Sequence, residues 1–184
     1  YFYLLKNLRK QTKKNKILIN SFTLFEMINM IIYAGFEPIL VDLNEDSFET
    51  DFEPIIEKYK NDLAAVTITH LNGFNSDIIN IKKILNEKYK DVVLIEDNAV
   101  GLGSKKNNLY SGNIGDYSIL SFNIMKNITS ITGGILVENS NKVRLSNDED
   151  FFKIENKFNL IKKIIFFFLL LFLNSRIIFF FFFK

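Results

Sequence analysis

Short apolar runs alternate with stretches of helical periodicity between about residue 16 and residue 138 of the chain. The β-branched and apolar runs predict strands at Ile17–Ile19, Glu37–Val41, Leu63–Thr69, Val92–Ile95, Tyr117–Phe122 and Gly134–Val137. Apolar residues at helical spacing predict helices over 23–34, 55–59 and 78–89. The alternation of strand and helix with short connections indicates a layered α/β domain with a mostly parallel sheet.

The run Leu63–Thr69 is apolar at nearly every position, as expected for a strand whose two faces are both covered by helices. We therefore expect three layers, with a mostly parallel sheet between helices. Pro38 has no N–H to donate, which places its strand at an edge of the sheet or the proline at the strand's beginning. Ligands of such sheets bind at the carboxyl ends of the strands.

The last part of the chain has a different character. An acidic break at 147–150 precedes a mixed, helix-like segment over 151–163, and two apolar runs follow at 164–173 and 177–183. We therefore divide the chain into a domain over 1–145 and a hydrophobic helical tail over 146–184.

Each apolar run of the tail is too short to cross a bilayer, which takes about 20 residues, and Arg176 separates the two. Because Lys162, Lys163 and Lys184 flank the runs, we favour membrane-surface contact through 164–184 as an interfacial or re-entrant helix hairpin. The alternative is a hydrophobic helix pair that other parts of a longer protein would cover, or a truncation artefact.

Composition limits the classes of partner. Hydrophobic residues make up 48% of the chain, and 23 basic and 21 acidic residues give a formal net charge of +2, so nothing suggests a nucleic-acid partner. A local basic cluster at 6–14 is typical of one solvated helix face. The absence of cysteine excludes disulfides and thiolate metal sites, and we predict no metal site. The absence of cysteine is also compatible with a reducing compartment. We expect a cytoplasmic location with membrane association through the tail.

Three side chains with complementary chemistry lie at or just beyond predicted strand ends. Asp97 follows the run VVLIE, Ser121 lies near the end of a later strand, and Lys126 lies a few residues beyond that strand. A carboxylate, a hydroxyl and an amine at neighbouring strand ends suit pyridoxal phosphate. The amine would react with its aldehyde, the carboxylate would keep its pyridine nitrogen protonated, and the hydroxyl would donate to its phosphate. The spacing alone favours solvated loop charges, because an Asp after a strand and a Lys in a loop occur in most α/β proteins.

Longer sequence blocks distinguish between these two interpretations. LIEDNAVGLGS resembles the IEDAAQ-x-x-G motif of the DegT/DnrJ/StrS sugar aminotransferases, and YSGNIGDYSILSFNIMKNITSITGGILV resembles their G-x-x-GD-x-x-x-FSF-x-x-x-K block with its later GG. ILINSFTLFEMINMIIYAGFEPILVD and VTITHLNGFNSDI resemble earlier blocks of the same family. The likeness runs in one order from Ile17 to Arg144.

The resemblance implies part of the large domain of the aspartate aminotransferase fold. It implies that Lys126 is the catalytic Schiff-base lysine of pyridoxal 5'-phosphate, Asp97 the partner of the pyridine nitrogen, and Ser121 a phosphate ligand. The implied reaction is transamination of a nucleotide-linked keto-deoxysugar with glutamate as the amino donor, in surface polysaccharide biosynthesis, by a homodimer.

The chain also departs from the family pattern. Val100 stands where relatives have Gln or His, Asn98 stands where they have alanine, and Leu24 stands at the ring-stacking aromatic position. The glycine-threonine turn that holds the phosphate in relatives is expected before Tyr1, and the family's small C-terminal domain is not present. The alternative function is therefore a catalytically inactive α/β fragment or paralogue that acts as a binding or membrane-associated module. We expect the single histidine, His70, to be structural.

Overall fold

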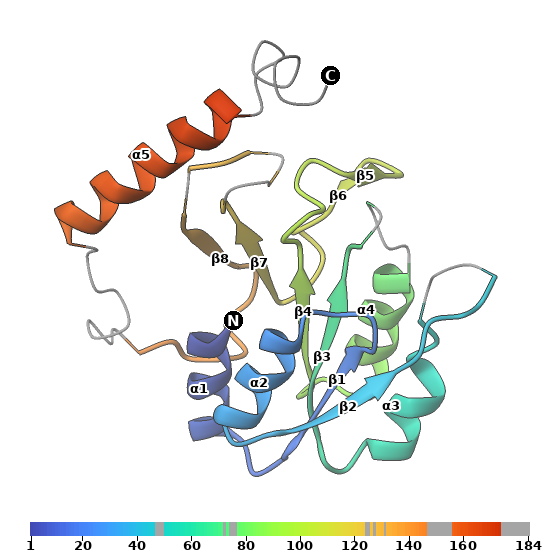
Figure 1. Ribbon diagram of the computed structural model, residues 1–184. Coiled ribbons are helices and arrows are strands. Elements are labelled where there is room, and N and C mark those ends of the chain that lie inside the picture. The colour runs from blue at the N-terminus through green and yellow to red at the C-terminus, as the bar shows by residue number, and fades with distance from the viewer. Residues whose placement is uncertain are drawn as a thin grey trace. The chain divides into compact units, whose positions relative to one another are not determined.

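The computed structural model describes residues 1–46, 50–71, 73, 77–123, 126, 128–130, 132–146 and 156–173 (Figure 1). The chain forms two compact units. The first comprises Tyr1–Ser121 and Gly134–Ser146, and the second comprises Phe122–Gly133 and Asn147–Lys184. The predicted acidic break at 147–150 and the second apolar run at 177–183 lie outside the described residues. The predicted domain boundary at residue 145 stays a prediction.

A six-stranded sheet with the order β2-β1-β3-β4-β7-β8 forms the centre of the first unit. Its strands are β1 Lys16–Asn20, β2 Glu37–Val41, β3 Leu63–Thr69, β4 Val93–Asp97, β7 Tyr117–Ser121 and β8 Gly134–Glu138. All neighbouring pairs are parallel except β7 and β8, which run antiparallel with Ser121 opposite Gly134. Pro38 lies in β2, at the outer end of the sheet, where its missing N–H costs no ladder hydrogen bond.

Four helices cover the sheet in the first unit: α1 Phe2–Gln11, α2 Phe25–Tyr33, α3 Glu53–Tyr59 and α4 Asp77–Lys88. Ile17 and Ile19 of β1 pack with α1 and α2 in one apolar cluster, whereas Leu18 between them packs with α3 and α4 in a second cluster. Successive side chains of a strand point to opposite faces, so the two helix pairs cover opposite faces of the sheet (Figure 1). The predicted three-layer α/β fold is confirmed.

The predicted helices and strands of this unit are confirmed to within two residues at each end. The basic cluster at 6–14 lies largely on α1, whose other side buries Leu4, Leu5 and Leu8. A small hairpin of β5 Lys105–Lys106 and β6 Leu109–Tyr110 was not predicted. Its two-residue turn has positive φ at Asn107 and Asn108, which asparagine tolerates better than most residues.

The segment after β8 is fixed to the core by one tyrosine. The buried Tyr117 hydroxyl donates to the carbonyl of Val143 at 2.9 Å and accepts from its N–H at 2.8 Å. Near the same segment, the Asn7 side chain accepts from the N–H and hydroxyl of Ser146 at 3.0 and 2.9 Å. These contacts join α1, β7 and residues 143–146 into one packed layer.

We expect Tyr117→Phe to lower the free energy of unfolding by about 1–3 kcal/mol, because it leaves the backbone polar groups of the buried Val143 without the hydroxyl. Tyr33 is 76% exposed at the end of α2, so Tyr33→Phe is the matched control and should change stability by less than about 0.5 kcal/mol. Urea denaturation of both variants measures the difference. Equal stabilities would contradict the assigned role of the hydroxyl.

Candidate functional site

Polar side chains gather where the parallel strands of the first unit end. Asn20, Thr69, Asp97 and Ser121 are the last residues of β1, β3, β4 and β7. Parallel strands place their carboxyl ends along one edge of the sheet, and Thr69 lies directly opposite Asp97 in the β3–β4 register. The structure therefore brings Asp97 and Ser121 to the same edge, on neighbouring strands.

Hydrogen bonds connect these strand ends to one another. The side-chain oxygen of Asn20 accepts from the backbone N–H of Thr69 at 3.0 Å, and the Thr69 hydroxyl donates to Asp97 Oδ2 at 3.5 Å. The N–H of Ala99 donates to Asp97 Oδ1 at 3.2 Å. The Asp97 carboxylate is thus buried and accepts hydrogen bonds from Thr69 and Ala99.

Ser121 is half-buried at the end of β7. Its antiparallel partner, Gly134, leaves no room for a side chain, because an added Cβ would lie 2.5 Å from the carbonyl oxygen of Leu120. Gly133, the residue before it, has a φ of +109°, which favours glycine. The glycine pair therefore permits close backbone packing beside Ser121.

Lys126 belongs to the second unit, within the segment Phe122–Gly133. The base of this segment is closed by hydrogen bonds from the N–H of Phe122 to Gly133 and from the N–H of Ser130 to Phe122, both at 2.9 Å. The N–H of Lys126 donates to the carbonyl of Asn123 at 3.2 Å, and the lysine side chain is half-buried. Its predicted convergence with Asp97 and Ser121 stays a prediction.

Directly before Asp97, the buried carboxylate of Glu96 organises the loop that leads into β7. It accepts hydrogen bonds from the backbone N–H groups of Gly112, Ile114 and Gly115 at 2.7, 2.8 and 2.5 Å, and from His70 Nε2 at 2.9 Å. Burial opposes ionisation of this group, but the hydrogen bonds outweigh it and leave the pKa of Glu96 below its usual value.

The two motifs that resemble the aminotransferase family are therefore in physical contact. Glu96 belongs to IED and its donors belong to G-x-x-G, sixteen or more residues later. A Cβ on Gly115 would lie 2.8 Å from Glu96 Cγ, so glycine is required there, and Gly112 has a φ of +93°. Sequence reasoning did not identify Glu96, and no local pattern marks it, because its backbone donors lie sixteen or more residues further along the chain.

Asp116 fixes the same loop from its other end. Its buried carboxylate accepts from the N–H of Leu94 at 2.8 Å and pairs with Lys82 at 2.7 Å and with Lys142 at 2.9 Å. Burial by itself would raise the pKa of Asp116. The hydrogen bond from the Leu94 N–H and the two lysines lower it by more, so the pKa of Asp116 lies below its usual value. Loop 112–116 is consequently attached to β4 at two points.

His70 and Asn98 are both buried beside this network. The contact of His70 with Glu96 accords with the structural role predicted for it. Asn98 is 1% exposed, and neither its amide nitrogen nor its amide oxygen has a hydrogen-bond partner among the described residues. A Cβ on Gly101 would lie 2.4 Å from the Asn98 oxygen, so the amide is packed tightly without being satisfied.

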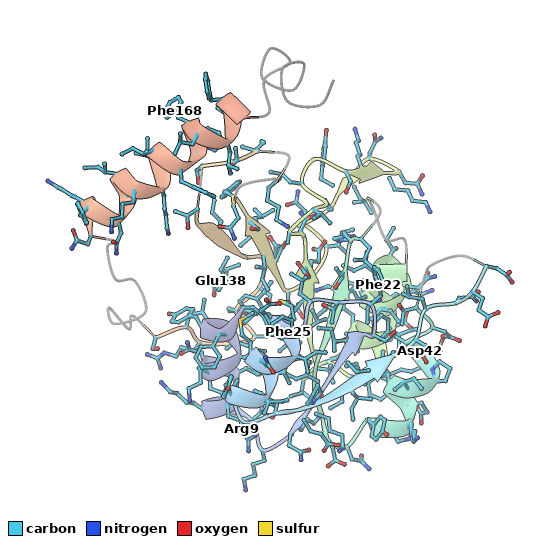
Figure 2. The ribbon with its side chains drawn as sticks, in the orientation of Figure 1. Arg9, Phe22, Phe25, Asp42, Glu138 and Phe168 are labelled. Carbon is cyan, nitrogen blue, oxygen red and sulfur yellow. The ribbon has the colours of Figure 1, made fainter. Side chains whose placement is uncertain are left out.

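The two other departures from the family pattern are exposed aliphatic side chains. Val100 follows the Asp97 strand end, and Leu24, which is 66% exposed, lies in the loop between β1 and α2. Phe25, adjacent to Leu24 in sequence, and Phe22, two residues before it, are also exposed (Figure 2). An aromatic side chain is therefore available near the position where relatives stack one on the cofactor.

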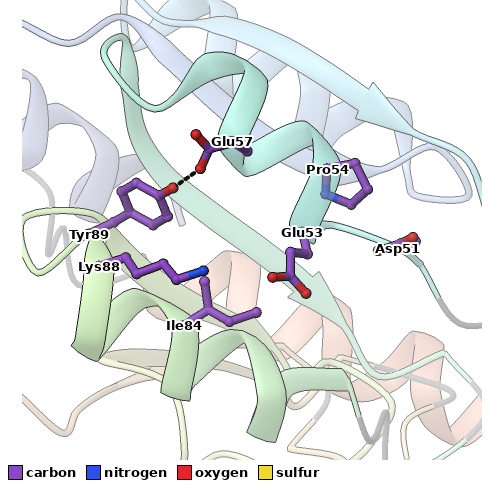
Figure 3. A pocket seen from close by; sticks show the side chains of 7 residues that line it. All are labelled: Asp51, Glu53, Pro54, Glu57, Ile84, Lys88 and Tyr89. Atoms are coloured by element: carbon purple, nitrogen blue, oxygen red, sulfur yellow. Dashed lines mark hydrogen bonds between the residues drawn. The ribbon is translucent and has the colours of Figure 1, made fainter.

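A pocket of about 390 Å³ lies elsewhere in the first unit, between α3 and α4 (Figure 3). Its lining is Asp51, Glu53, Pro54, Glu57, Ile84, Lys88 and Tyr89. Lys60 pairs with the Glu57 carboxylate, and the Tyr89 hydroxyl donates to it. Both contacts lower the pKa of Glu57. None of the strand-end residues lines this pocket, so it does not form part of the candidate site.

Within the ranges that the structure describes, no group of three or more His, Asp or Glu side chains lies where it could hold a metal ion.

A sequence profile of the DegT/DnrJ/EryC1/StrS aminotransferase family matches residues 3–146 of the chain. GDP-perosamine synthase of Escherichia coli O157:H7 is 32% identical over 125 residues, which are 68% of this chain and 34% of that protein. GDP-perosamine synthase of Vibrio cholerae is 30% identical over 129 residues, 70% of this chain and 35% of that protein. The chain spans about a third of the length of these curated relatives.

Solved structures show the same fold. The putative sugar aminotransferase Spr1654 from Streptococcus pneumoniae, in its PLP-form, superimposes with a TM-score of 0.66 at 21% identity, over 82% of this chain and 42% of that one. Helicobacter pylori PseC, an aminotransferase involved in the biosynthesis of pseudoaminic acid, gives 0.65 at 20% identity, over 77% and 38% of the two chains. The predicted fold resemblance is confirmed.

We expect Glu96→Gln to lower the free energy of unfolding at pH 7 by about 1–3 kcal/mol, because it weakens a buried, charge-assisted network. The folded-state pKa of Glu96 lies below its unfolded value of about 4.3, so the ionised carboxylate contributes fully above that pH. This contribution is lost as the pH falls through the lower folded-state pKa.

Urea denaturation between pH 7 and pH 3 should therefore show a steeper acid loss of stability in the wild type than in Glu96→Gln. Glu45 is exposed, so Glu45→Gln is the control and should follow the wild-type curve. Parallel curves for Glu96→Gln and the wild type would show that the Glu96 network does not depend on its charge.

Two of the buried asparagines, Asn98 and Asn20, should respond to alanine in opposite directions. Asn98→Ala removes an unsatisfied amide, and we expect it to raise the free energy of unfolding by roughly 1 kcal/mol. Asn20→Ala removes an amide that bonds Thr50 and the N–H of Thr69, and we expect it to lower that energy by about 1–3 kcal/mol. Thermal and urea unfolding measure both, and a loss of stability in Asn98→Ala would mean that the amide has a partner.

Proposed function

Because the chain belongs to the DegT/DnrJ/EryC1/StrS aminotransferase family, we propose that it contributes the cofactor-binding part of an enzyme that aminates a nucleotide-linked keto-deoxysugar with pyridoxal phosphate. One observation supports the proposal above the others: a buried carboxylate, Asp97, ends β4, and the neighbouring parallel strand β7 ends in Ser121. Lys126 follows five residues after Ser121.

The residues present fit the cofactor in their chemistry. The Asp97 carboxylate is buried at the carboxyl end of β4, and a cationic pyridinium would complement its charge. Coulombic attraction between such groups is stronger at a buried site than in water. The Ser121 hydroxyl suits a phosphate oxygen as a hydrogen-bond donor. When bound, pyridoxal phosphate supplies an aromatic ring that accepts electron density from the substrate carbon.

Each of these residues would then have a defined role. Asp97 would keep the proton on the ring nitrogen and so maintain the ring's positive charge. Lys126 would hold the cofactor through its Nζ atom and then carry a proton to and from the substrate carbon as a general base and acid. Glu96 acts on the site indirectly, because it fixes loop 112–115 against the strand that ends in Asp97.

The finer features of the reaction are also proposals. We take the substrate to be a nucleotide sugar, since the two curated relatives are named GDP-perosamine synthases. Glutamate as amino donor, a role in surface polysaccharide biosynthesis, a cytoplasmic location and assembly as a homodimer follow from the family resemblance alone.

Adding pyridoxal phosphate to the chain should produce the visible absorbance band of a cofactor held by a protein amine. We expect this band to be lost in Lys126→Ala and kept in Lys105→Ala, an exposed lysine in β5 whose ammonium lies over the ring of Tyr110. Borohydride reduction followed by peptide mass spectrometry should place the added mass on Lys126.

Equal bands in the two variants would refute the assignment of Lys126. A wild-type chain that leaves the cofactor spectrum unchanged would instead favour the alternative, a catalytically inactive α/β module.

A further inference from the structure

The hydroxyl of Thr69 lies next to the carboxylate that would pair with the cofactor. Thr69 ends β3 and stands opposite Asp97, the last residue of β4, in their parallel register. Its hydroxyl donates to Asp97 Oδ2 at 3.5 Å, while the N–H of Ala99 donates to Oδ1 at 3.2 Å. One carboxylate oxygen is therefore contacted by a side chain of the neighbouring strand, and the other by the backbone that follows β4.

A second buried side chain fixes the backbone of Thr69. The side-chain oxygen of Asn20, at the end of β1, accepts from the Thr69 N–H at 3.0 Å, and its amide nitrogen donates to the hydroxyl of Thr50. Asn20, Thr50 and Thr69 are 1%, 1% and 6% exposed, so water has little access to these hydrogen bonds. Polar contacts thus extend from Asn20 through Thr69 to Asp97, across the neighbouring strands β1, β3 and β4 (Figure 1).

The length of the contact between Thr69 and Asp97 bears on its role. Hydrogen bonds from a hydroxyl to a carboxylate are usually about 2.5–2.7 Å long, so at 3.5 Å the two groups can still move closer together. Hydrogen bonds of catalytic sites often shorten when the reacting molecule binds. A carboxylate offers about four lone-pair positions, so it can be held by a hydroxyl and a backbone N–H and also accept from a pyridinium N–H.

We propose that Thr69 is a positioning residue: its hydroxyl holds the Asp97 carboxylate in the orientation that a pyridinium nitrogen requires, and Asn20 holds Thr69 in place. The inference rests on the proposed function, because Asp97 has this task only in a chain that binds pyridoxal phosphate. Thr69 acts through Asp97 and touches neither substrate nor reacting atoms. Since a displacement of about 1 Å at such a site can cost about 100-fold, the loss of the hydroxyl should be measurable.

Titration with pyridoxal phosphate, followed by the visible absorbance band, tests the proposal. Thr69→Val keeps the shape of the side chain and removes its hydroxyl, and we expect the affinity for the cofactor to fall about threefold to tenfold, as for the loss of one hydrogen bond. Thr69→Ser returns the hydroxyl and should restore most of the lost affinity.

The matched control is Thr67→Val. Thr67 is a second buried threonine, two residues earlier on the same face of β3, and its hydroxyl bonds the Tyr1 hydroxyl at 2.8 Å instead. Thr67→Val should lower the stability of the chain, as Thr69→Val does, but bind the cofactor as the wild type does. An equal loss of affinity in the two valine variants, or no recovery in Thr69→Ser, would show a structural role alone and overturn the proposal.

A second measurement needs no cofactor. If Thr69 holds Asp97, the effects of Thr69→Val and Asp97→Ala on stability are coupled, because each removes the same contact. Urea denaturation should then show that the double variant loses less stability than the two single variants together. Additive losses would overturn the contact on which the proposal depends.

The outcomes also separate this inference from the proposed function. A wild-type chain that leaves the cofactor spectrum unchanged would refute the proposed function and, with it, the role of Thr69 toward the cofactor. A wild-type band that Thr69→Val reproduces at equal cofactor affinity would overturn the role of Thr69 and leave the proposed function standing.

Discussion

A buried carboxylate must be compensated by hydrogen bonds or by opposite charge, and Glu96 meets this requirement with donors from a distant part of the chain. Three N–H groups of residues 112–115 point at it, and His70 adds a fourth contact. Because the donors lie sixteen to nineteen residues beyond Glu96, the contact closes a long loop onto β4. Asp116, the residue after Gly115, is a second buried carboxylate, and Lys82 and Lys142 compensate its charge.

The contact of Glu96 with loop 112–115 helps to position the candidate site. Asp97 is the residue after Glu96, and Ser121 ends β7, the strand that begins directly after Asp116. Two of the proposed cofactor ligands therefore follow directly from the segments that these two buried carboxylates hold together. Parallel pairing of β4 and β7 then brings both to one edge of the sheet. The proposed amine comes from a different compact unit, on the short segment that connects β7 to β8.

The two units differ in how far their apolar side chains are buried. In the first, Ile17, Leu18 and Ile19 are fully buried, alternating between two helix layers. In the second, most of the large apolar side chains that the structure describes on α5, Lys157–Leu173, are exposed. Among the described helices, none is both long and apolar enough to cross a membrane. A sheet with helices on both faces satisfies its own apolar residues, whereas a helix that is apolar all round requires an apolar environment from outside.

The order of strands and helices could be predicted from sequence because hydrophobic periodicity is a local property. The run Leu63–Thr69 alone indicated a covered central strand, and Pro38 indicated the edge of the sheet. Asp97 and Ser121 could be predicted as neighbours because parallel strand ends share an edge. Glu96, the unsatisfied amide of Asn98 and the glycine requirement at position 115 could not, because each depends on atoms from segments remote in sequence. Hydrogen bonds between distant segments leave no periodic trace in a sequence, so only the tertiary structure decided them.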